Sequence, residues 1–327
     1  MRDGKKHITI CDFDFDEYDI ELRMCREAGV GVDRKQGREP EQIIANAQGA
    51  EGIITSYGVF TREVFEALSP TLKVVSRTGV GYDTIDVDAA SEFGVAVCNV
   101  PGYADEVVSD HAIMLALACL RRVNEQDANL RCGVWPYAST RPFGQCAGRV
   151  FGVVGMGGIG RAAARKAAGL GFRVVCWSRS LEPGTVTPEG YPVLELDELF
   201  SEADVISLHC ALASETYHLV DARALSLMKP EAVLVNTSRG AVVDTLALAE
   251  ALCEGRIWGA GLDVFETEPL EHGHPILQAP HTVLTPHAAY WSEESGVELR
   301  TRACQAAIDV LAGRCPQDAL NWERIHR

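Results

Sequence analysis

The sequence lacks any apolar run close to the about 18 residues that a membrane span requires, and its start, MRDGKKHITIC, lacks the apolar core of a signal peptide. We therefore expect a cytoplasmic protein with no membrane partner. Basic residues are also scarce, because 30 Lys and Arg stand against 46 Asp and Glu, for a net charge of -16. This excess of negative charge argues against nucleic acid and anionic membranes as general partners.

The eleven cysteines include no C-x-x-C pair and no Cys/His spacing typical of zinc. Most lie in apolar runs, where cysteine behaves as a small hydrophobic residue. We therefore expect free thiols in a reducing compartment and no bound metal. Low-complexity segments and short repeats are absent, and a length of 327 residues favours two domains.

The segment 149–179 predicts a strand, a tight glycine turn, a helix and a second strand. Its glycines form the pattern G-x-G-x-x-G, in which the first permits a sharp turn, the second admits a pyrophosphate and the third allows close packing of helix and strand. The amide groups and the dipole at the start of the helix favour an anion. We predict a dinucleotide-binding loop formed by Gly155, Met156, Gly157, Gly158, Ile159 and Gly160.

Short apolar segments alternate with helical ones on both sides of this loop, which is typical of βαβ units. Strands are expected at 7–11, 52–55, 72–76, 95–98, 204–209, 232–236, 259–263 and 282–285. The pattern predicts an α/β fold with two doubly wound parallel sheets, and long helices at 106–123 and 293–312 are expected to cross between the domains. Residues 12–19 predict an acidic surface turn, and residues 131–145 predict an irregular arm that covers a partner subunit.

Three residues with acid–base or anion-binding chemistry each follow a predicted strand: Arg239, Glu268 and His287. Ligands of doubly wound sheets bind outside the carboxyl ends of the strands, so we expect these side chains to converge. Arginine can hold a carboxylate, histidine can take or return a hydroxyl proton, and a carboxylate favours the imidazolium. Each residue alone has an ordinary structural explanation, whereas the set fits oxidation of a hydroxy acid.

Several long segments resemble the D-isomer-specific 2-hydroxyacid dehydrogenase family: GVGYDTIDVDAA (79–90), GVAVCNVPGYADEVVSDHA (94–112), GVVGMGGIGRAAA (152–164), MKPEAVLVNTSRGAVVD (228–244), GLDVFETEP (261–269) and LTPHAAYWSEES (284–295). The resemblance implies a Rossmann nucleotide-binding domain, 102–289, inserted into a flavodoxin-like substrate domain, 1–101 plus 290–327. It also implies a homodimer and interconversion of a D-2-hydroxy acid and its 2-oxo acid with a nicotinamide cofactor. The segments AVCNVP and PHAAYWSEES are similar to the branch of the C-terminal-binding proteins, which are corepressors.

The resemblance also implies roles for individual residues. His287 is expected to be the acid/base, paired with Glu268 and not with Glu266, while Arg239 faces the substrate. The backbone amides of Val80 and Gly81 are expected to meet the substrate carboxylate. Asp263 is expected to contact the nicotinamide carboxamide, and Thr237 and Ser238 to form the adjoining cofactor loop. Tyr290 and Trp291 either line the substrate pocket or pack against a crossing helix.

The sequence departs from the usual pattern at two places. A dinucleotide fold usually ends its second strand with an acidic residue that binds the ribose 2′-hydroxyl, but here Ser178 and Arg179 stand there. With a guanidinium and no carboxylate, this position favours NADP over NAD, unless Arg179 points to solvent. The family's usual His-x-Pro after the fourth strand is His209-Cys210-Ala211, which bears on packing around the adenosine.

Two other functions stay open. A dinucleotide-sensing, corepressor-like binding protein with little turnover is one, because such proteins can retain the same Arg/Glu/His set. A dehydrogenase of a different donor, such as phosphite, is the other. Formate is disfavoured by Glu268, because formate-oxidising relatives have glutamine there.

Overall fold

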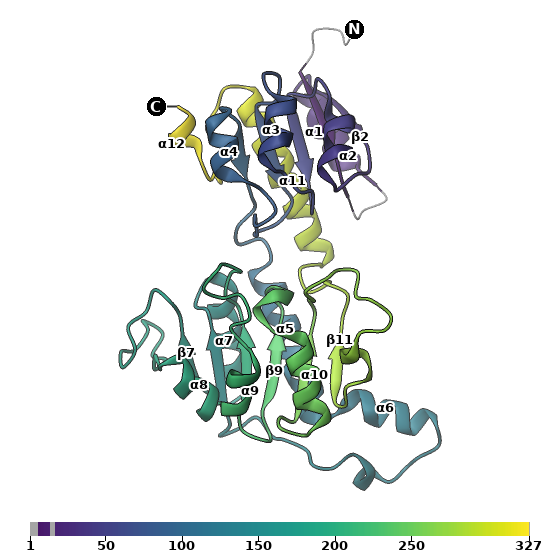
Figure 1. Cartoon of the computed structure of the whole chain (residues 1–327), viewed down its shortest axis with the longest axis vertical. Coiled ribbons are helices and arrows are strands. Elements are labelled where there is room, and N and C mark those ends of the chain that lie inside the picture. Colours follow the sequence, from purple (N-terminus) through teal and green to yellow (C-terminus); the bar gives the residue numbers. More distant parts are fainter. Residues whose placement is uncertain (1–5, 14–16, 327) are drawn as a thin grey trace. The chain divides into compact units, whose positions relative to one another are not determined.

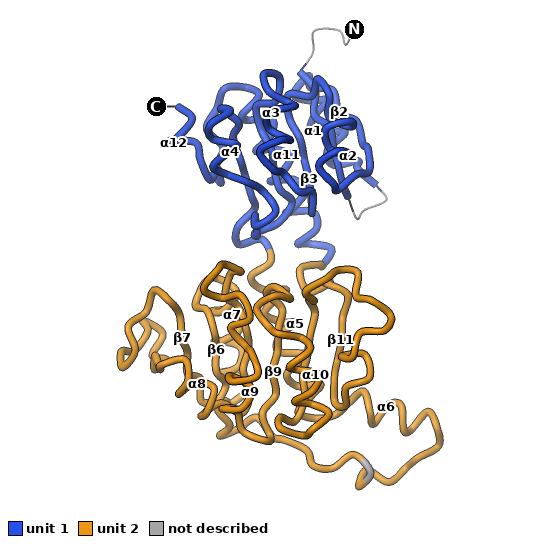
Figure 2. Tube along the Cα trace, in the orientation of Figure 1, with its two compact units in different colours: residues 1–103, 292–327 blue, residues 104–291 orange. Residues whose placement is uncertain are grey.

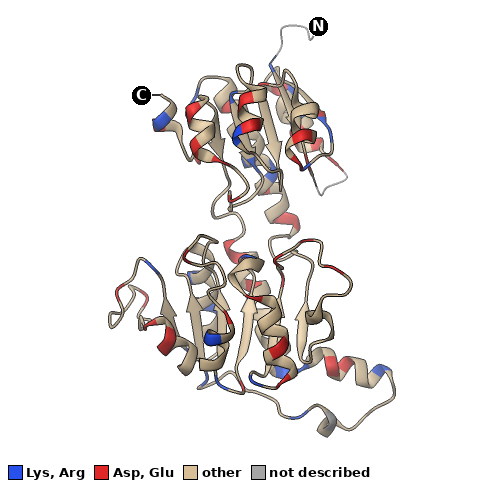
Figure 3. Cartoon of the chain, in the orientation of Figure 1, with Lys and Arg blue, Asp and Glu red and all other residues tan. Residues whose placement is uncertain are grey.

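A computed structural model describes residues 6–13 and 17–326 of the chain (Figure 1). The chain divides into two units: unit 1 consists of Met1–Tyr103 and Ser292–Arg327, and unit 2 of Ala104–Trp291 (Figure 2). Each unit contains one parallel β-sheet with helices packed on it, and the predicted α/β fold class is confirmed. Charged side chains of both signs are mixed along the helices of the two units (Figure 3).

The sheet of unit 1 has the strand order β2-β1-β3-β4-β5, with every pair parallel. This is the flavodoxin-like order. The strands are β1 (His7–Ile10), β2 (Gly31–Arg34), β3 (Gly52–Thr55), β4 (Val74–Arg77) and β5 (Ala96–Cys98). The helices are α1 (Asp19–Glu27), α2 (Pro40–Ala47), α3 (Arg62–Leu68), α4 (Val87–Glu92), α11 (Glu293–Leu311) and α12 (Trp322–Ile325). The sequence did not predict β2, because this half-buried edge strand, GVDR, has little apolar content.

The C-terminal segment completes unit 1 by packing on strands that lie about 200 residues earlier in the chain. Ser76 of β4 donates its hydroxyl to the carbonyl of Ala303 in α11 at 2.8 Å. Arg300 of α11 forms a two-pronged ion pair with Glu21 of α1, at 2.8 and 2.6 Å, and both side chains are buried. Asn321 accepts the amide of Val97 at 2.9 Å. These contacts explain why the unit is discontinuous in sequence.

Unit 2 has the strand order β11-β10-β9-β8-β6-β7, again all parallel. Its strands are β6 (Val150–Val154), β7 (Arg173–Trp177), β8 (Val205–Leu208), β9 (Val233–Asn236), β10 (Gly259–Leu262) and β11 (Thr282–Leu284). Its helices are α5 (Asp105–Arg121), α6 (Val123–Arg131), α7 (Gly158–Gly169), α8 (Leu196–Glu202), α9 (Ala222–Leu227) and α10 (Thr245–Cys253), with 3₁₀ turns η1 (Tyr137–Thr140), η2 (Gly240–Val242) and η3 (Pro275–Gln278).

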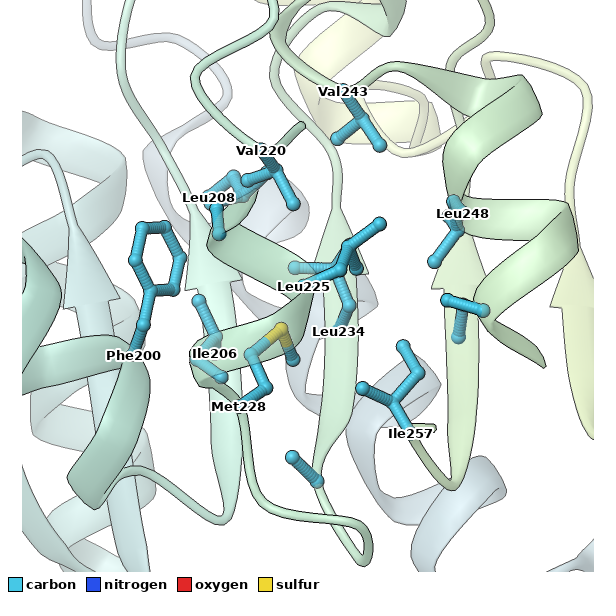
Figure 4. Close-up of a cluster of buried hydrophobic side chains, with 14 of the residues drawn as sticks. Phe200, Ile206, Leu208, Val220, Leu225, Met228, Leu234, Val243, Leu248 and Ile257 are labelled. Atoms are coloured by element: carbon cyan, nitrogen blue, oxygen red, sulfur yellow. The ribbon is translucent and has the colours of Figure 1, made fainter. Parts of the chain in front are cut away.

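The four inner strands of unit 2, β6, β8, β9 and β10, are buried throughout, which explains their continuous apolar runs. One face packs against α8, α9 and α10 through Phe200, Leu225, Leu248 and their neighbours (Figure 4). The other face packs against α5 and α7, through Leu115 and Ala164 among others. Gly152 of β6 permits the close approach of α8, because a Cβ there would lie 2.8 Å from Leu199. The paired layers hold the carboxyl ends of the strands in a fixed row.

The prediction of one long helix over 106–123 is wrong at its C-terminal end, because α5 ends at Arg121. The chain leaves the helix at Arg122, whose φ of 53° is left-handed, and then begins α6. Arg122 stabilises this break by donating to Glu125 at 2.8 Å and to the carbonyl of Arg141 at 2.8 Å. The break directs α6 and the following arm away from the line of α5 (Figure 1).

Among the helices that the structure describes, none has the length and apolar character needed to cross a membrane. Within the described residues, no group of three or more His, Cys, Asp or Glu side chains is placed to hold a metal ion.

Candidate active site

The glycine turn joins the end of β6 to the start of α7, at the point where the sheet order reverses between β6 and β8. Gly155 has a φ of 102°, and a Cβ there would lie 2.7 Å from the backbone of His209 and Cys210. A Cβ at Gly160 would lie 1.9 Å from the carbonyl oxygen of Gly155. At Gly157 the corresponding space is open. The first and third glycines thus serve close packing, and the second leaves room for a ligand at the N-terminus of α7.

The loop after β9 offers a polar group to the same edge. The hydroxyl of Thr237 is buried and has no hydrogen-bond partner among the described residues. Buried polar groups normally have partners, so this orphaned oxygen is consistent with a bound ligand that supplies one. Ser238, by contrast, donates its amide and hydroxyl to Asn236, at 3.0 and 2.8 Å. The glycine turn and Thr237 together fit a dinucleotide.

His287 and Glu268 form the pair that the sequence predicts. The Nδ1 atom of His287 lies 2.6 Å from Oε2 of Glu268, and Oε1 of Glu268 accepts the amide of Phe265 at 2.9 Å. Burial by itself raises the pKa of Glu268, but His287, the Phe265 amide and Arg239 together hold that pKa below its usual value. Glu268 is therefore a carboxylate at neutral pH, and it leaves Nε2 of His287 as the nitrogen that can exchange a proton with a ligand.

Arg239 stands at the start of η2, directly after the β9 loop. Its carbonyl accepts the side-chain amide of Asn236 at 2.8 Å, and its Nη1 donates to the carbonyl of Ser238 at 2.8 Å. Because its charge contributes to the low pKa of Glu268, the guanidinium belongs to the same electrostatic group as the histidine pair. Arg239, Glu268 and His287 thus share the carboxyl edge of the unit 2 sheet.

Asp263 is fully buried, and its carboxylate binds the turn that carries His287. It accepts the hydroxyl of Thr285 at 2.5 Å and the amides of Ala288 and Ala289 at 2.9 Å each. His111 of α5 completes this group, with Nε2 2.9 Å from the Thr285 hydroxyl. The sequence interpretation missed His111 and Thr285; the signal was a single histidine within the apolar pattern of α5.

The turn expected to hold a substrate carboxylate lies in unit 1, after β4. Gly79 has a φ of 151°, its carbonyl accepts the amide of Val100 at 2.9 Å, and Asn99 donates to the carbonyl of Val80 at 2.7 Å. Within the described residues, the amides of Val80 and Gly81 donate no backbone hydrogen bond. The turn is therefore fixed by its carbonyls and keeps two donors for a ligand.

The end of β7 places Arg179 beside a carboxylate from another loop. Nη1 of Arg179 lies 3.3 Å from Oε2 of Glu215, and both side chains are more than half exposed. The hydroxyls of Ser178 and Ser180 lie 3.3 Å apart. Arg179 thus pairs with a neighbouring carboxylate, and the end of β7 carries charges of both signs.

His209 begins the segment His209-Cys210-Ala211, in which Ala211 replaces the usual proline, and it lies half-buried behind the glycine turn. Its Nε2 lies 2.8 Å from the hydroxyl of Ser207, and burial lowers its pKa to about 4. The imidazole is therefore neutral at physiological pH and belongs to the packing behind Gly155.

Comparison with known proteins matches these features to one family. Residues 113–289 match the model of the D-isomer specific 2-hydroxyacid dehydrogenase, NAD binding domain. The chain is 43% identical over 296 residues to a glyoxylate reductase of Thermococcus onnurineus, covering 88% of this chain and 87% of the relative. It is 42% identical over 267 residues to a glyoxylate reductase of Korarchaeum cryptofilum, covering 80% of each.

Solved structures agree over nearly the whole length. A crystal structure of a protein from Thermus thermophilus has a TM-score of 0.87 and 36% identity, covering 96% of this chain and 99% of that one. A glyoxylate reductase from Paecilomyes thermophila has a TM-score of 0.86 and 29% identity, covering 98% and 99%.

Proposed function

The chain belongs to the D-isomer specific 2-hydroxyacid dehydrogenase family and is an NAD(P)-dependent oxidoreductase of hydroxy and oxo acids, and we propose that it reduces glyoxylate or a similarly small 2-oxo acid at the edge formed by Arg239, Glu268 and His287. The observation that carries this assignment of residues is the 2.6 Å contact between His287 and Glu268, beside Arg239. The names of the glyoxylate reductase relatives support the substrate class. The special resemblance to C-terminal-binding proteins stays a prediction.

Each residue of the proposed site has a separate role in the reaction. The bound nicotinamide supplies or accepts the hydride. In reduction, Nε2 of His287 gives a proton to the carbonyl oxygen of the substrate, and in oxidation it takes that proton back. Glu268 stabilises the protonated imidazole, and Arg239 holds the substrate by its carboxylate or carbonyl oxygen. The amides of Val80 and Gly81 are the proposed donors to the substrate carboxylate, and Gly155 to Gly160 with Thr237 hold the cofactor.

The test is a reductase assay with glyoxylate, hydroxypyruvate, pyruvate and bulkier 2-oxo acids, followed by nicotinamide absorbance with NADH and NADPH in parallel. We expect the highest kcat/KM for the smallest acids. A phosphite oxidation assay and a pull-down with and without dinucleotide accompany it. Dinucleotide binding with no turnover of any acid would contradict the proposal and favour a sensing protein.

We also propose that NADP(H) is accepted, and preferred to NAD(H), through Arg179. The absence of a carboxylate at Ser178 and the guanidinium of Arg179 support this choice. The pairing of Arg179 with Glu215 opposes it in part, because a 2′-phosphate must displace that carboxylate. The parallel assays with the two cofactors measure the outcome, and a higher kcat/KM with NADH would remove the preference for NADPH.

A homodimer formed through unit 2 is the third part of the proposal. The arm after α5 exposes large apolar side chains: Leu130 is 55% exposed, Trp135 83% and Tyr137 62%. These side chains come from one short segment, and exposed apolar surface of this kind supports an interaction site there. Sedimentation of the protein and of its Trp135→Glu variant tests this, with a dimer expected for the first and a weakened dimer for the second.

The eleven cysteines, all free, support a reducing compartment such as the cytoplasm.

A further inference from the structure

The loop after β10 carries two glutamates, and only Glu268 belongs to the histidine pair. Oε2 of Glu266 lies 3.1 Å from Nε2 of His218, and its Oε1 accepts the amide of Thr245 at 2.9 Å. We propose that Glu266 and His218 are positioning residues that hold the turn carrying Arg239. This inference rests on the proposed function, because it takes Arg239 as the residue that binds substrate.

The turn that carries Arg239 is enclosed between two other segments. A Cβ at Gly240 would lie 1.8 Å from the carbonyl carbon of Phe265 and 2.3 Å from the nitrogen of Glu266, so the β10 loop presses directly on the turn. On the other side, the amide of His218 donates to the carbonyl of Ala241 at 2.8 Å. Arg239 therefore cannot move its backbone without moving the segments of His218 and Glu266.

The Glu266 side chain links those two segments to each other and to α10. Burial alone raises its pKa, but the Thr245 amide and His218 lower it below the ordinary value, so Glu266 is charged at neutral pH. The amide of Thr245 lies at the N-terminus of α10, where the helix dipole favours an anion. One carboxylate thus connects the segment after β8, the loop after β10 and the start of α10.

His218 is itself held in one orientation. Its φ of 49° is left-handed, its ring stacks on Tyr217 with centroids 4.1 Å apart, and its Nδ1 lies 4.0 Å from Oδ2 of Asp244. Most residues with side chains avoid this backbone region, whereas Asn tolerates it. A His218→Asn variant therefore removes the contact with Glu266 and keeps the local backbone.

The arrangement gives one loop control over both proposed reacting side chains. Glu268 orients His287 through Nδ1, and Glu266 acts on the turn of Arg239 through His218, whose amide donates to Ala241. Hydride transfer is sensitive to small displacements of the substrate, and a shift of about 1 Å can cost about 10²-fold in rate. Looser positioning of Arg239 would therefore lower turnover without removing any group that touches the substrate.

The first measurement compares kcat and KM for glyoxylate in Glu266→Ala, Glu266→Gln and His218→Asn. We expect kcat/KM to fall about tenfold in Glu266→Ala and in His218→Asn, with the Kd for dinucleotide unchanged. Glu266→Gln keeps an acceptor for the Thr245 amide and should stay within about threefold of the wild type. Glu271→Ala removes an exposed carboxylate further along the same loop and is the matched control, expected to behave as the wild type.

A double-mutant cycle separates positioning from a general loss of structure. If Glu266 acts through Arg239, then Glu266→Ala adds no further loss to an Arg239→Ala background. Losses that multiply in the double variant, or a Glu266→Ala enzyme as active as the wild type, would overturn the inference. If Glu266→Ala does not fold, the cycle with His218→Asn decides.

The two failures are distinguishable. The proposed function fails if the wild type turns over no 2-oxo acid or if Arg239→Ala retains full activity. The positioning role alone fails if the wild type reduces a 2-oxo acid, Arg239→Ala loses activity, and the losses in the double variant multiply.

Discussion

The two sheets share a strand order through their first five strands, yet they treat the polar side chains at their carboxyl edges differently. In unit 1, Asp12 accepts the hydroxyl of Thr55 at 2.8 Å and the amides of Ser56 and Tyr57 at 2.5 and 2.6 Å. These bonds tie the loop after β3 to Asp12, which follows β1. In unit 2, Asp263 likewise accepts the amides of Ala288 and Ala289, but two further carboxylates at that edge pair with imidazoles, Glu268 with His287 and Glu266 with His218.

The difference shows that topology alone does not create a reactive site. A carboxylate whose oxygens are used by backbone amides stabilises a loop, whereas a carboxylate shared with an imidazole changes how that imidazole holds a proton. Disrupting the first kind of contact should affect stability, and disrupting the second kind should affect turnover. Three substitutions test this distinction, and a fourth tests an exposed ion pair at the end of β7.

The largest effect is expected for His287→Asn, because this change removes the proposed acid/base. Asn is the chosen replacement because it tolerates the left-handed backbone of His287, with φ of 53°. The variant should lose about 10²–10⁴-fold in kcat for glyoxylate reduction. His281→Asn is the matched control, since His281 also has a left-handed φ and lies 2.9 Å from Glu125. A control that lost as much activity as the test variant would show that the assignment to His287 is wrong.

In unit 1, Asp12→Ala should lower the free energy of unfolding by about 3 kcal/mol, because it leaves buried amides without an acceptor. Urea denaturation measures this effect. Dinucleotide affinity should not change, because the glycine turn lies in unit 2. Weakened dinucleotide binding with unchanged stability would remove the contrast between the two edges.

Glu268→Gln should lower kcat for reduction about tenfold, because the imidazolium loses its stabilising charge. The pKa of Glu268 is held below its ordinary value of 4.5, so the wild type keeps this negative charge at neutral pH. The contribution of the charged Glu268 to the stability of the fold is lost only as the pH falls through that lowered pKa. The alkaline limb of the pH–rate profile for reduction should move to lower pH in the variant. An unmoved limb would argue against proton transfer by the pair.

The smallest effect is expected at the end of β7. Glu215→Gln frees Arg179 from its partner and should raise the ratio of kcat/KM for NADPH over NADH about threefold, as expected for one exposed ion pair. Glu182→Gln, an exposed carboxylate three residues after Arg179, is the control. A ratio that rises equally in both variants would indicate a general charge effect.

The sequence predicted the parts of this protein that depend on local patterns. Apolar runs of four or five residues located β3, β6 and β9, because strands buried on both faces have no polar alternation. The glycine spacing located the turn at Gly155. The positions of Arg239, Glu268 and His287 after strand ends predicted one edge for all three, because parallel strands align their carboxyl ends.

The tertiary structure decided what depends on partners far apart in the chain. The prediction of an acidic surface turn at 12–19 is wrong for Asp12, which is 1% exposed because the loop after β3 folds over it; residues 14–16 lie outside the described residues. The helix break at Arg122 follows from contacts with Glu125 and Arg141. Local chemistry does not distinguish Glu266 from Glu268, and the family resemblance alone assigned Glu268 to His287; the pairing of Glu266 with His218 emerged only from the structure. Those pairings join residues 48 and 19 positions apart, and a local pattern carries no record of such contacts.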